Sequence, residues 1–190
     1  MSKNRMEAFS DGVLAIIITI MVLELAIPHE ADLAALRPLI PIFLSYVLSF
    51  VFLGIYWNNH HHLMQVVQHV DGRVLWANLH LLFWLSLIPF VTGWMGENNF
   101  ATLPVALYGT VLLFAAIAYF ILTGALLSIH ERGSVLATAL GRDIKGKVSV
   151  VIYVVAIPLA FISPWLSCAL FVLVAVMWLI PDQRIEKTLA

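Results

Sequence analysis

Long apolar runs separated by short polar breaks dominate the chain. A helix needs about 20 mainly apolar residues to cross the hydrocarbon core of a bilayer, where only helices and closed barrels satisfy their backbone groups. Unbroken apolar runs favour helices over the alternating strands of a barrel. The pattern therefore predicts an all-α integral membrane protein with about six spans, at residues 6–27, 38–64, 74–95, 102–128, 148–162 and 164–180.

Most of the breaks between these runs have a local cause. Pro28 and the polar residues after it end the first run, and Asp71 with Gly72 separates the second run from the third. Residues 96–99 are predicted to form a polar turn. Ser163 and Pro164 divide the last apolar stretch into two short halves, so a kinked or re-entrant hairpin is an alternative to two spans there. No internal repeat is visible, and residues 1–190 are predicted to form one transmembrane domain.

The charged residues are few and unevenly distributed. Only 11% of residues are charged and 62% are hydrophobic, whereas a soluble domain carries about a quarter charged residues. The net charge of −1 points to no nucleic-acid partner. By the positive-inside rule, both termini are predicted to be cytoplasmic, and basic loop residues are expected to meet anionic lipid. The basic residues on that side are Lys3, Arg5, Arg73, Arg132, Arg142, Lys145, Lys147, Arg184 and Lys187, which leaves Arg37 outside.

Ionisable and polar residues at the inner end of the first span are candidates for a functional role, because such groups are costly at membrane depth. At 100° per residue, one stripe of this helix carries Phe9, Gly12, Ile16, Thr19, Ile20, Leu23 and Ile27, with Arg5 at its cytoplasmic end. Ser10 and Asp11 point away from the stripe, so they are expected to face neighbouring helices of the same subunit. The alternative is a hydrated helix start capped by these two side chains.

Candidate partners for Asp11 lie at the same predicted depth. Such a carboxylate accepts hydrogen bonds from histidine, asparagine or tryptophan donors and would fix the first helix against the second and third. The partners expected to support it are Trp57, Asn58, His62, Asn78 and His80. Consecutive helical residues diverge by about 100°, so His60, His61 and His62 cannot converge on one ion. No metal site or cofactor is predicted, although a metal or proton site that joins His62 or His80 to Asp11 remains an alternative.

Arg5, Phe9, Ser10 and Asp11 spell the pattern R-x-x-x-F-S-D at the start of the first apolar helix. This pattern resembles the signature of the transmembrane-protein-175 family, the lysosomal potassium channels and their bacterial relatives. The resemblance continues through residues 57–62, Asn78 and the pair Pro89 and Phe90. Six spans in a single repeat resemble the bacterial members, whereas the animal proteins carry two such repeats.

The resemblance implies a homotetramer in which the first helix of each subunit lines a central pore. Carried over by position, Ile16 would form a hydrophobic constriction, with Thr19 and Leu23 as the next layers and Ile20 on the same stripe. The motif residues would stabilise the pore helix. The implied protein is a leak-type, potassium-selective channel in a bacterial cell inner membrane, with the potassium ion as permeant species and no enzymatic activity.

Two other classes of function remain open from the sequence. A proton- or metal-coupled transporter would use the inner Asp11, His62 and His80 cluster, although transporters more often show inverted repeats and a charged midplane site. A membrane enzyme or redox carrier would need convergent ligands, and only the inner histidines offer any. For a channel, a narrow apolar constriction gates by dewetting. Because potassium holds its water less tightly than sodium, partial dehydration at this constriction would favour potassium.

Overall fold

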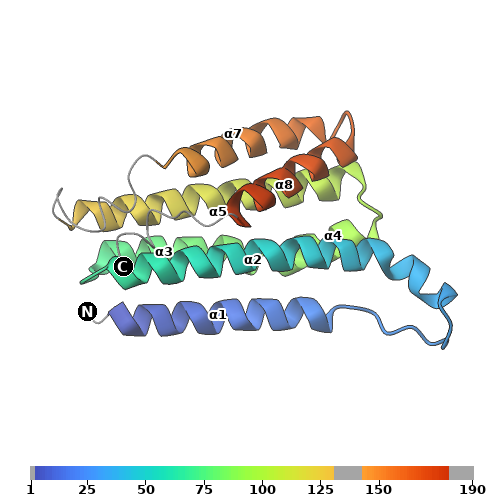
Figure 1. Cartoon of the computed structure of the whole chain (residues 1–190), viewed down its shortest axis with the longest axis horizontal. Helices are drawn as coiled ribbons and strands as arrows, with labels where there is room; N and C mark the ends of the chain where they lie inside the picture. Colours follow the sequence, from blue (N-terminus) through green and yellow to red (C-terminus); the bar gives the residue numbers. More distant parts are fainter. Residues whose placement is uncertain (1–2, 131–142, 180–190) are drawn as a thin grey trace.

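The computed structural model describes residues 3–130 and 143–179, and the account of the fold is confined to them. In this part the chain is a bundle of helices, most of which run alongside one another, while the last one slants across the bundle (Figure 1). The elements are α1 (Lys3–Leu23), the 3-10 helix η1 (Ala34–Leu39), α2 (Ile40–Val66), α3 (Gly72–Ser86), α4 (Ile88–Glu97), α5 (Thr102–Ser128), α7 (Ile144–Leu159) and α8 (Pro164–Leu179).

The predicted all-helical membrane fold is confirmed. Each of the six predicted spans coincides with a helix or with two successive helices. Within the described residues, four segments are long and apolar enough to cross a membrane, at residues 3–23, 34–66, 72–97 and 102–128. Helices α7 and α8 have 16 residues each. At 1.5 Å per residue they reach about 24 Å, less than the roughly 30 Å of a bilayer core. The last two predicted spans are therefore a short antiparallel helix pair.

Three predicted boundaries were wrong in detail. The first helix ends at Leu23, and Ile27 lies beyond it in the connection to η1. The third span consists of two helices, α3 and α4. Pro89 has no N–H to continue the helical hydrogen bonds, and the N–H of Leu87, between the two helices, donates to the carbonyl of Trp84. The turn predicted at residues 96–99 begins later, at residue 98, since α4 runs to Glu97.

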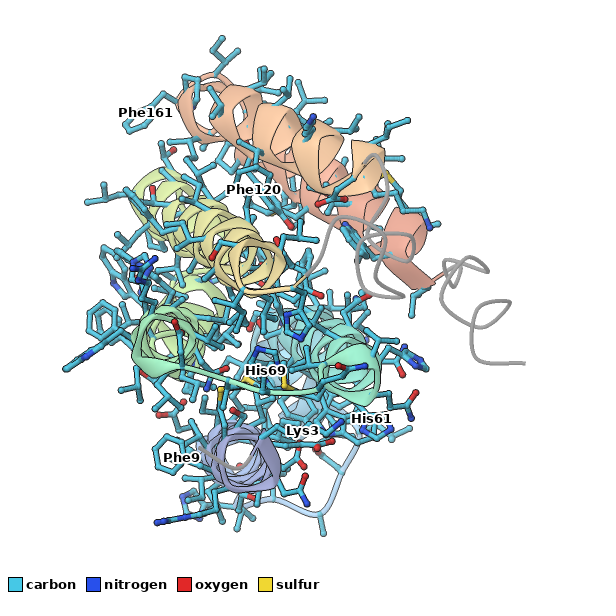
Figure 2. All side chains as sticks on the ribbon, turned by 90° about the vertical axis from the view of Figure 1, so that its left-hand side faces the viewer. Lys3, Phe9, His61, His69, Phe120 and Phe161 are labelled. Carbon is cyan, nitrogen blue, oxygen red and sulfur yellow. The ribbon has the colours of Figure 1, made fainter. Side chains whose placement is uncertain are left out.

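Helix α1 lies at one edge of the bundle. It contacts α2, α3 and α4, while α7 and α8 pack on α5, and α8 also touches α2. The end view in Figure 2 places α1 on one side of the molecule and the α7–α8 pair on the other, with α2, α3 and α5 between them. Helix α1 therefore covers the core with one face and leaves the other face without a partner among residues 3–130 and 143–179.

Two glycines permit close helix contacts. A Cβ at Gly96 would lie 2.7 Å from the Ile42 Cα atom and 2.5 Å from the Ser45 hydroxyl oxygen, so α4 could not approach α2 as closely with any larger residue. A Cβ at Gly109 would lie 2.7 Å from the Phe171 ring, at the contact between α5 and α8. Small residues let membrane helices pack closely where no hydrophobic driving force brings them together.

Candidate functional site

The free face of α1 carries the residues predicted to share one stripe. We define the α1 stripe as Phe9, Gly12, Ile16, Thr19, Ile20 and Leu23, all of which are exposed in the single chain. Ile16 is 61% exposed and Leu23 is 76% exposed. Phe9 points away from the bundle in Figure 2. The opposite face is buried through Met6, Ser10, Leu14, Ile17 and Met21.

Thr19 is the hydroxyl residue of the α1 stripe. Its hydroxyl donates a hydrogen bond of 2.8 Å to the carbonyl of Ala15, one turn earlier in the same helix. The proton is used within the helix, so the oxygen lone pairs remain available on the exposed side. The stripe thus presents apolar side chains interrupted by one layer of hydroxyl oxygen.

The buried face of α1 is joined to α2 and α3 by a chain of hydrogen bonds. The Asn78 amide donates to the Ser10 hydroxyl over 2.9 Å, and that hydroxyl donates to the Met6 carbonyl over 2.8 Å. The Asn78 side-chain oxygen lies 2.9 Å from Nε2 of His60. Ser10, His60 and Asn78 are each at most 2% exposed. We call these three residues the buried polar triad.

The direction of these bonds determines the tautomer of His60. Because Asn78 uses its nitrogen to donate to Ser10, its oxygen is left to accept, so Nε2 of His60 must carry a proton. Nδ1 of His60 is buried and has no hydrogen-bond partner in the described part of the chain. In the neutral ring this nitrogen is an acceptor, and an unpaired buried acceptor has a free-energy cost. Hydrogen bonds are therefore donated from His60 to Asn78 and from Asn78 to Ser10, and Nδ1 of His60 is the atom of the triad left unpaired by the described residues.

A second and more exposed set of contacts joins α1 to α2. The Trp57 indole donates to the Asp11 carboxylate over 3.0 Å, and the Trp57 ring stacks on His61 with centroids 5.8 Å apart. His61 Nδ1 lies 3.4 Å from the Glu7 carboxylate. Glu7 and Asp11 are one turn apart on α1, as are Trp57 and His61 on the antiparallel α2. Two successive turns of α1 are thus joined to two successive turns of α2, through Asp11 with Trp57 and Glu7 with His61.

Lys3 ties the start of α1 to the end of α2. Its ammonium group donates to the carbonyls of Met64 and Val67, at 3.0 Å and 2.7 Å. These are the carbonyls left without intrahelical partners at a helix C-terminus, where a cation is also favoured by the helix dipole. The start of α1 and the end of α2 are therefore held together by charge as well as by packing.

Three relatives match this chain along much of its length. A potassium channel from Chryseobacterium sp. (strain P1-3) is 53% identical over 189 residues, which cover 100% of this chain and 98% of the relative. A crystal structure described as a lysosomal potassium-selective channel TMEM175 homolog from Chamaesiphon minutus superposes with a TM-score of 0.76 at 28% identity, covering 94% of this chain and 96% of the other. The rat endosomal/lysosomal proton channel TMEM175 is 32% identical over 151 residues, which are 70% of this chain and 30% of that protein.

The family profile described as endosomal/lysosomal potassium channel TMEM175 matches residues 5–89. The chain belongs to the TMEM175 family. The matched segment begins at Arg5 and contains the α1 stripe, the buried polar triad and the Trp57 contact, so the polar contacts described above lie almost wholly inside the family region. TMEM175 is a family of ion channels and not of enzymes, which confirms the assignment of this chain to a channel class.

Not every residue predicted to support the TMEM175 motif joins it. Asn58 is exposed and forms no hydrogen bond within the described residues. His80 accepts instead from the Trp84 indole, 3.0 Å away on the same helix. His62 is partly buried, and its Nδ1 has no hydrogen-bond partner among residues 3–130 and 143–179. Arg5 is exposed at the N-terminal end of the stripe, as its place on the helical wheel indicated.

Sequence reasoning missed the central role of His60 and the contact of Lys3. A signal for His60 exists, because the buried residues Ser49, Phe52, Leu53, His60 and Leu63 of α2 follow helical spacing toward the core. His60 is the histidine of the run 60–62 that falls on this face. Among residues 3–130 and 143–179, no group of three or more His, Cys, Asp or Glu side chains is placed to share a metal ion.

Proposed function

We propose that four copies of this chain surround a potassium-conducting pore lined by the α1 stripe. The proposal rests on the position of α1 at the edge of the subunit. Its apolar face is exposed in the described part of the chain, and its opposite face is joined to α2 and α3. One helix cannot enclose a pore, so the stripe needs copies of itself around an axis. A matching channel from Chryseobacterium is named for potassium.

The narrowest layer of this pore is the ring of Ile16 side chains. Ile16 is 61% exposed and lies midway along α1. A ring of branched apolar groups excludes bulk water and forces an ion to shed part of its hydration shell. Because potassium is less strongly hydrated than sodium, this barrier is lower for potassium, and the channel leaks potassium selectively.

Thr19, Ile20 and Leu23 form the layers beyond Ile16. The Thr19 hydroxyl donates to its own helix, so its oxygen can face a partly dehydrated cation with free lone pairs. Ile20 and Leu23, exposed by 42% and 76%, continue the apolar wall. In the orientation predicted from the basic residues, these layers lead from the constriction toward the outside.

The buried polar triad positions the pore helix. If α1 rotated about its own long axis by one residue position, about 100°, the α1 stripe would turn away from the pore axis and other residues would face the pore. The bond from Asn78 to Ser10 and the bond from Trp57 to Asp11 approach α1 from two neighbouring helices. Together they resist that rotation, so the motif residues act on the pore through the orientation of α1.

The membrane placement completes the proposal. The chain is a multi-pass membrane protein, and we place it in a bacterial cell inner membrane with both termini in the cytoplasm. In that orientation Lys3 and the start of α7 are on the cytoplasmic side, and the connection between α1 and α2 is outside.

Thiol modification at the outer end of the stripe tests the pore assignment. In a Cys168→Ala background, which removes the single native cysteine, Leu23→Cys should become sensitive to a bulky charged thiol reagent that blocks potassium flux into liposomes. Leu173→Cys is the matched control, because Leu173 is also exposed, at 54%, but lies on α8. Equal block of both variants, or of neither, would exclude α1 as the pore lining.

A further inference from the structure

A cavity of about 390 Å³ lies between α2, α5, α7 and α8 in the half of the bundle that contains the start of α7. We call it the inner cavity. Its walls are almost entirely apolar and include Phe52, Ile55, Ala116, Ile117, Phe120 and Val150. The volume falls within the range of about 300–1,000 Å³ that small-molecule pockets occupy. The α1 stripe and the buried polar triad contribute nothing to it.

The inner cavity lies beyond a close contact between α5 and α8, where Gly109 packs against the Phe171 ring. Toward the inner end, the Trp178 indole of α8 donates to the Ser149 hydroxyl of α7 over 2.9 Å, and both residues line the cavity. That bond joins α8 to α7 and fixes the Trp178 ring in the cavity wall.

Two tyrosines of the cavity wall make no hydrogen bond to the described residues. They are Tyr56 and Tyr153, whereas the hydroxyl of Tyr119, also in the wall, donates to the carbonyl of Asn59 over 3.4 Å. The Tyr153 side chain is only 2% exposed. A hydroxyl beside an apolar cavity favours an occupant with an acceptor oxygen over a pure hydrocarbon.

The mouth of the cavity is polar and carries a positive charge. Lys147 and Asp143 line it at the start of α7. The Asp143 carboxylate already accepts a 2.8 Å bond from the Gly146 N–H as the cap of that helix. The Lys147 ammonium group beside a helix N-terminus favours an anionic group.

We propose that the inner cavity binds one acyl chain of an anionic phospholipid from the cytoplasmic leaflet. The chain occupies the apolar interior, an ester oxygen accepts from Tyr56 or Tyr153, and the phosphate lies against Lys147. This rests on the proposed function in one respect: with α1 at the pore axis, α7 and α8 lie on the opposite, lipid-facing side of the subunit (Figure 2). Basic residues at that surface attract anionic lipid.

Photolabelling tests the site. The full chain would be reconstituted in phosphatidylcholine liposomes that contain a small fraction of phosphatidylglycerol with a diazirine on its acyl chain, then irradiated and mapped by mass spectrometry. We expect label on cavity-lining peptides of α5 and α7, displaced by unlabelled phosphatidylglycerol several-fold better than by added phosphatidylcholine. Label spread evenly over all exposed helices would overturn the proposal.

Two variants separate the cavity from the general lipid contact. Ala116→Phe fills the inner cavity and should abolish cavity labelling, whereas Ala125→Phe, at a partly buried alanine of the same helix outside the cavity, should retain it. Lys147→Gln changes an exposed side chain and should remove the preference for phosphatidylglycerol. Labelling that survives both Ala116→Phe and Lys147→Gln unchanged would refute the site.

Potassium flux measured on the same liposomes keeps the two proposals apart. Specific labelling without flux would leave the lipid site standing and remove the proposed channel function. Flux without specific labelling would do the reverse and overturn only the lipid site.

Discussion

The side-chain amide of Asn78 donates a 2.9 Å hydrogen bond to the hydroxyl of Ser10, which lies 68 positions earlier in the chain. Both residues are almost fully buried, and the Asn78 oxygen is bonded in turn to His60. A single amide thus joins α1, α2 and α3 at the level of the sequence motif.

Replacement of Asn78 by leucine should destabilise the subunit. Asn78→Leu keeps the side-chain volume but leaves Ser10 without its donor and gives His60 a second unpaired nitrogen, and each buried unpaired group costs about 1–3 kcal/mol. The midpoint of thermal unfolding, followed by fluorescence-detected gel filtration in detergent, should fall. Asn58→Leu is the control, since Asn58 is exposed. Equal midpoints for the two variants would show that the triad does not stabilise the fold.

Loss of the Asp11 carboxylate should have a smaller effect, because Asp11 and Trp57 are partly exposed. Asp11→Ala removes the acceptor of the Trp57 indole and should cost about 1 kcal/mol, with a lower yield of assembled protein. Asp11→Asn keeps an acceptor oxygen and should behave nearly like the wild type. A normally assembled Asp11→Ala channel with altered ion selectivity would contradict a purely positioning role.

A polar residue at position 16 should reduce selectivity. Ile16→Asn places an amide in the proposed constriction, which would wet and widen it and raise sodium permeability relative to potassium. Val154→Asn makes a similar change at a 53% exposed position of α7 and should leave permeability unchanged. The ratio is read from reversal potentials under mixed ionic conditions. An unaltered ratio in Ile16→Asn would remove Ile16 from the selectivity mechanism.

A methyl group at Gly96 should separate α4 from α2. The added Cβ would meet the Ile42 Cα atom at 2.7 Å, a backbone contact that cannot rotate away. Overpacking of this kind costs about 1–3 kcal/mol. Gly54→Ala lies on α2 with nothing within 4 Å of the new methyl. It should be neutral or slightly stabilising, because alanine is the better helix former. The same unfolding measurement distinguishes the two, and equal stability would argue against close α2–α4 packing.

The sequence predicts the apolar helical segments and the two faces of α1, because these depend on apolar length and on the 100° rotation between residues. Ser10 and Asp11 were expected to face neighbouring helices, and hydrogen bonds place them there. The break between α3 and α4 was not predicted. Pro89 stands in the sequence, but an apolar run does not show whether a proline will bend a membrane helix or divide it in two.

The depth of the polar side chains in the membrane was easier to predict than the side chains with which they form hydrogen bonds. Asn58, His60, His62 and His80 all lie near the level of Asp11, yet among the described residues only His60 of these four bonds to Asn78. Which of several equivalent side chains makes a contact depends on the rotation of α2 and α3 about their own axes. That rotation is fixed by close packing, as at Gly96 and Ile42, and not by composition.

If copies of α1 enclose a potassium-selective pore, the reversal potential should show it. It would be measured on the purified protein in a planar bilayer with potassium chloride on one side and sodium chloride on the other. We expect a potential displaced strongly toward the potassium equilibrium value. A potential near zero, or flux that requires a proton or metal gradient, would contradict it and make Asp11, His62 and His80 the residues to test.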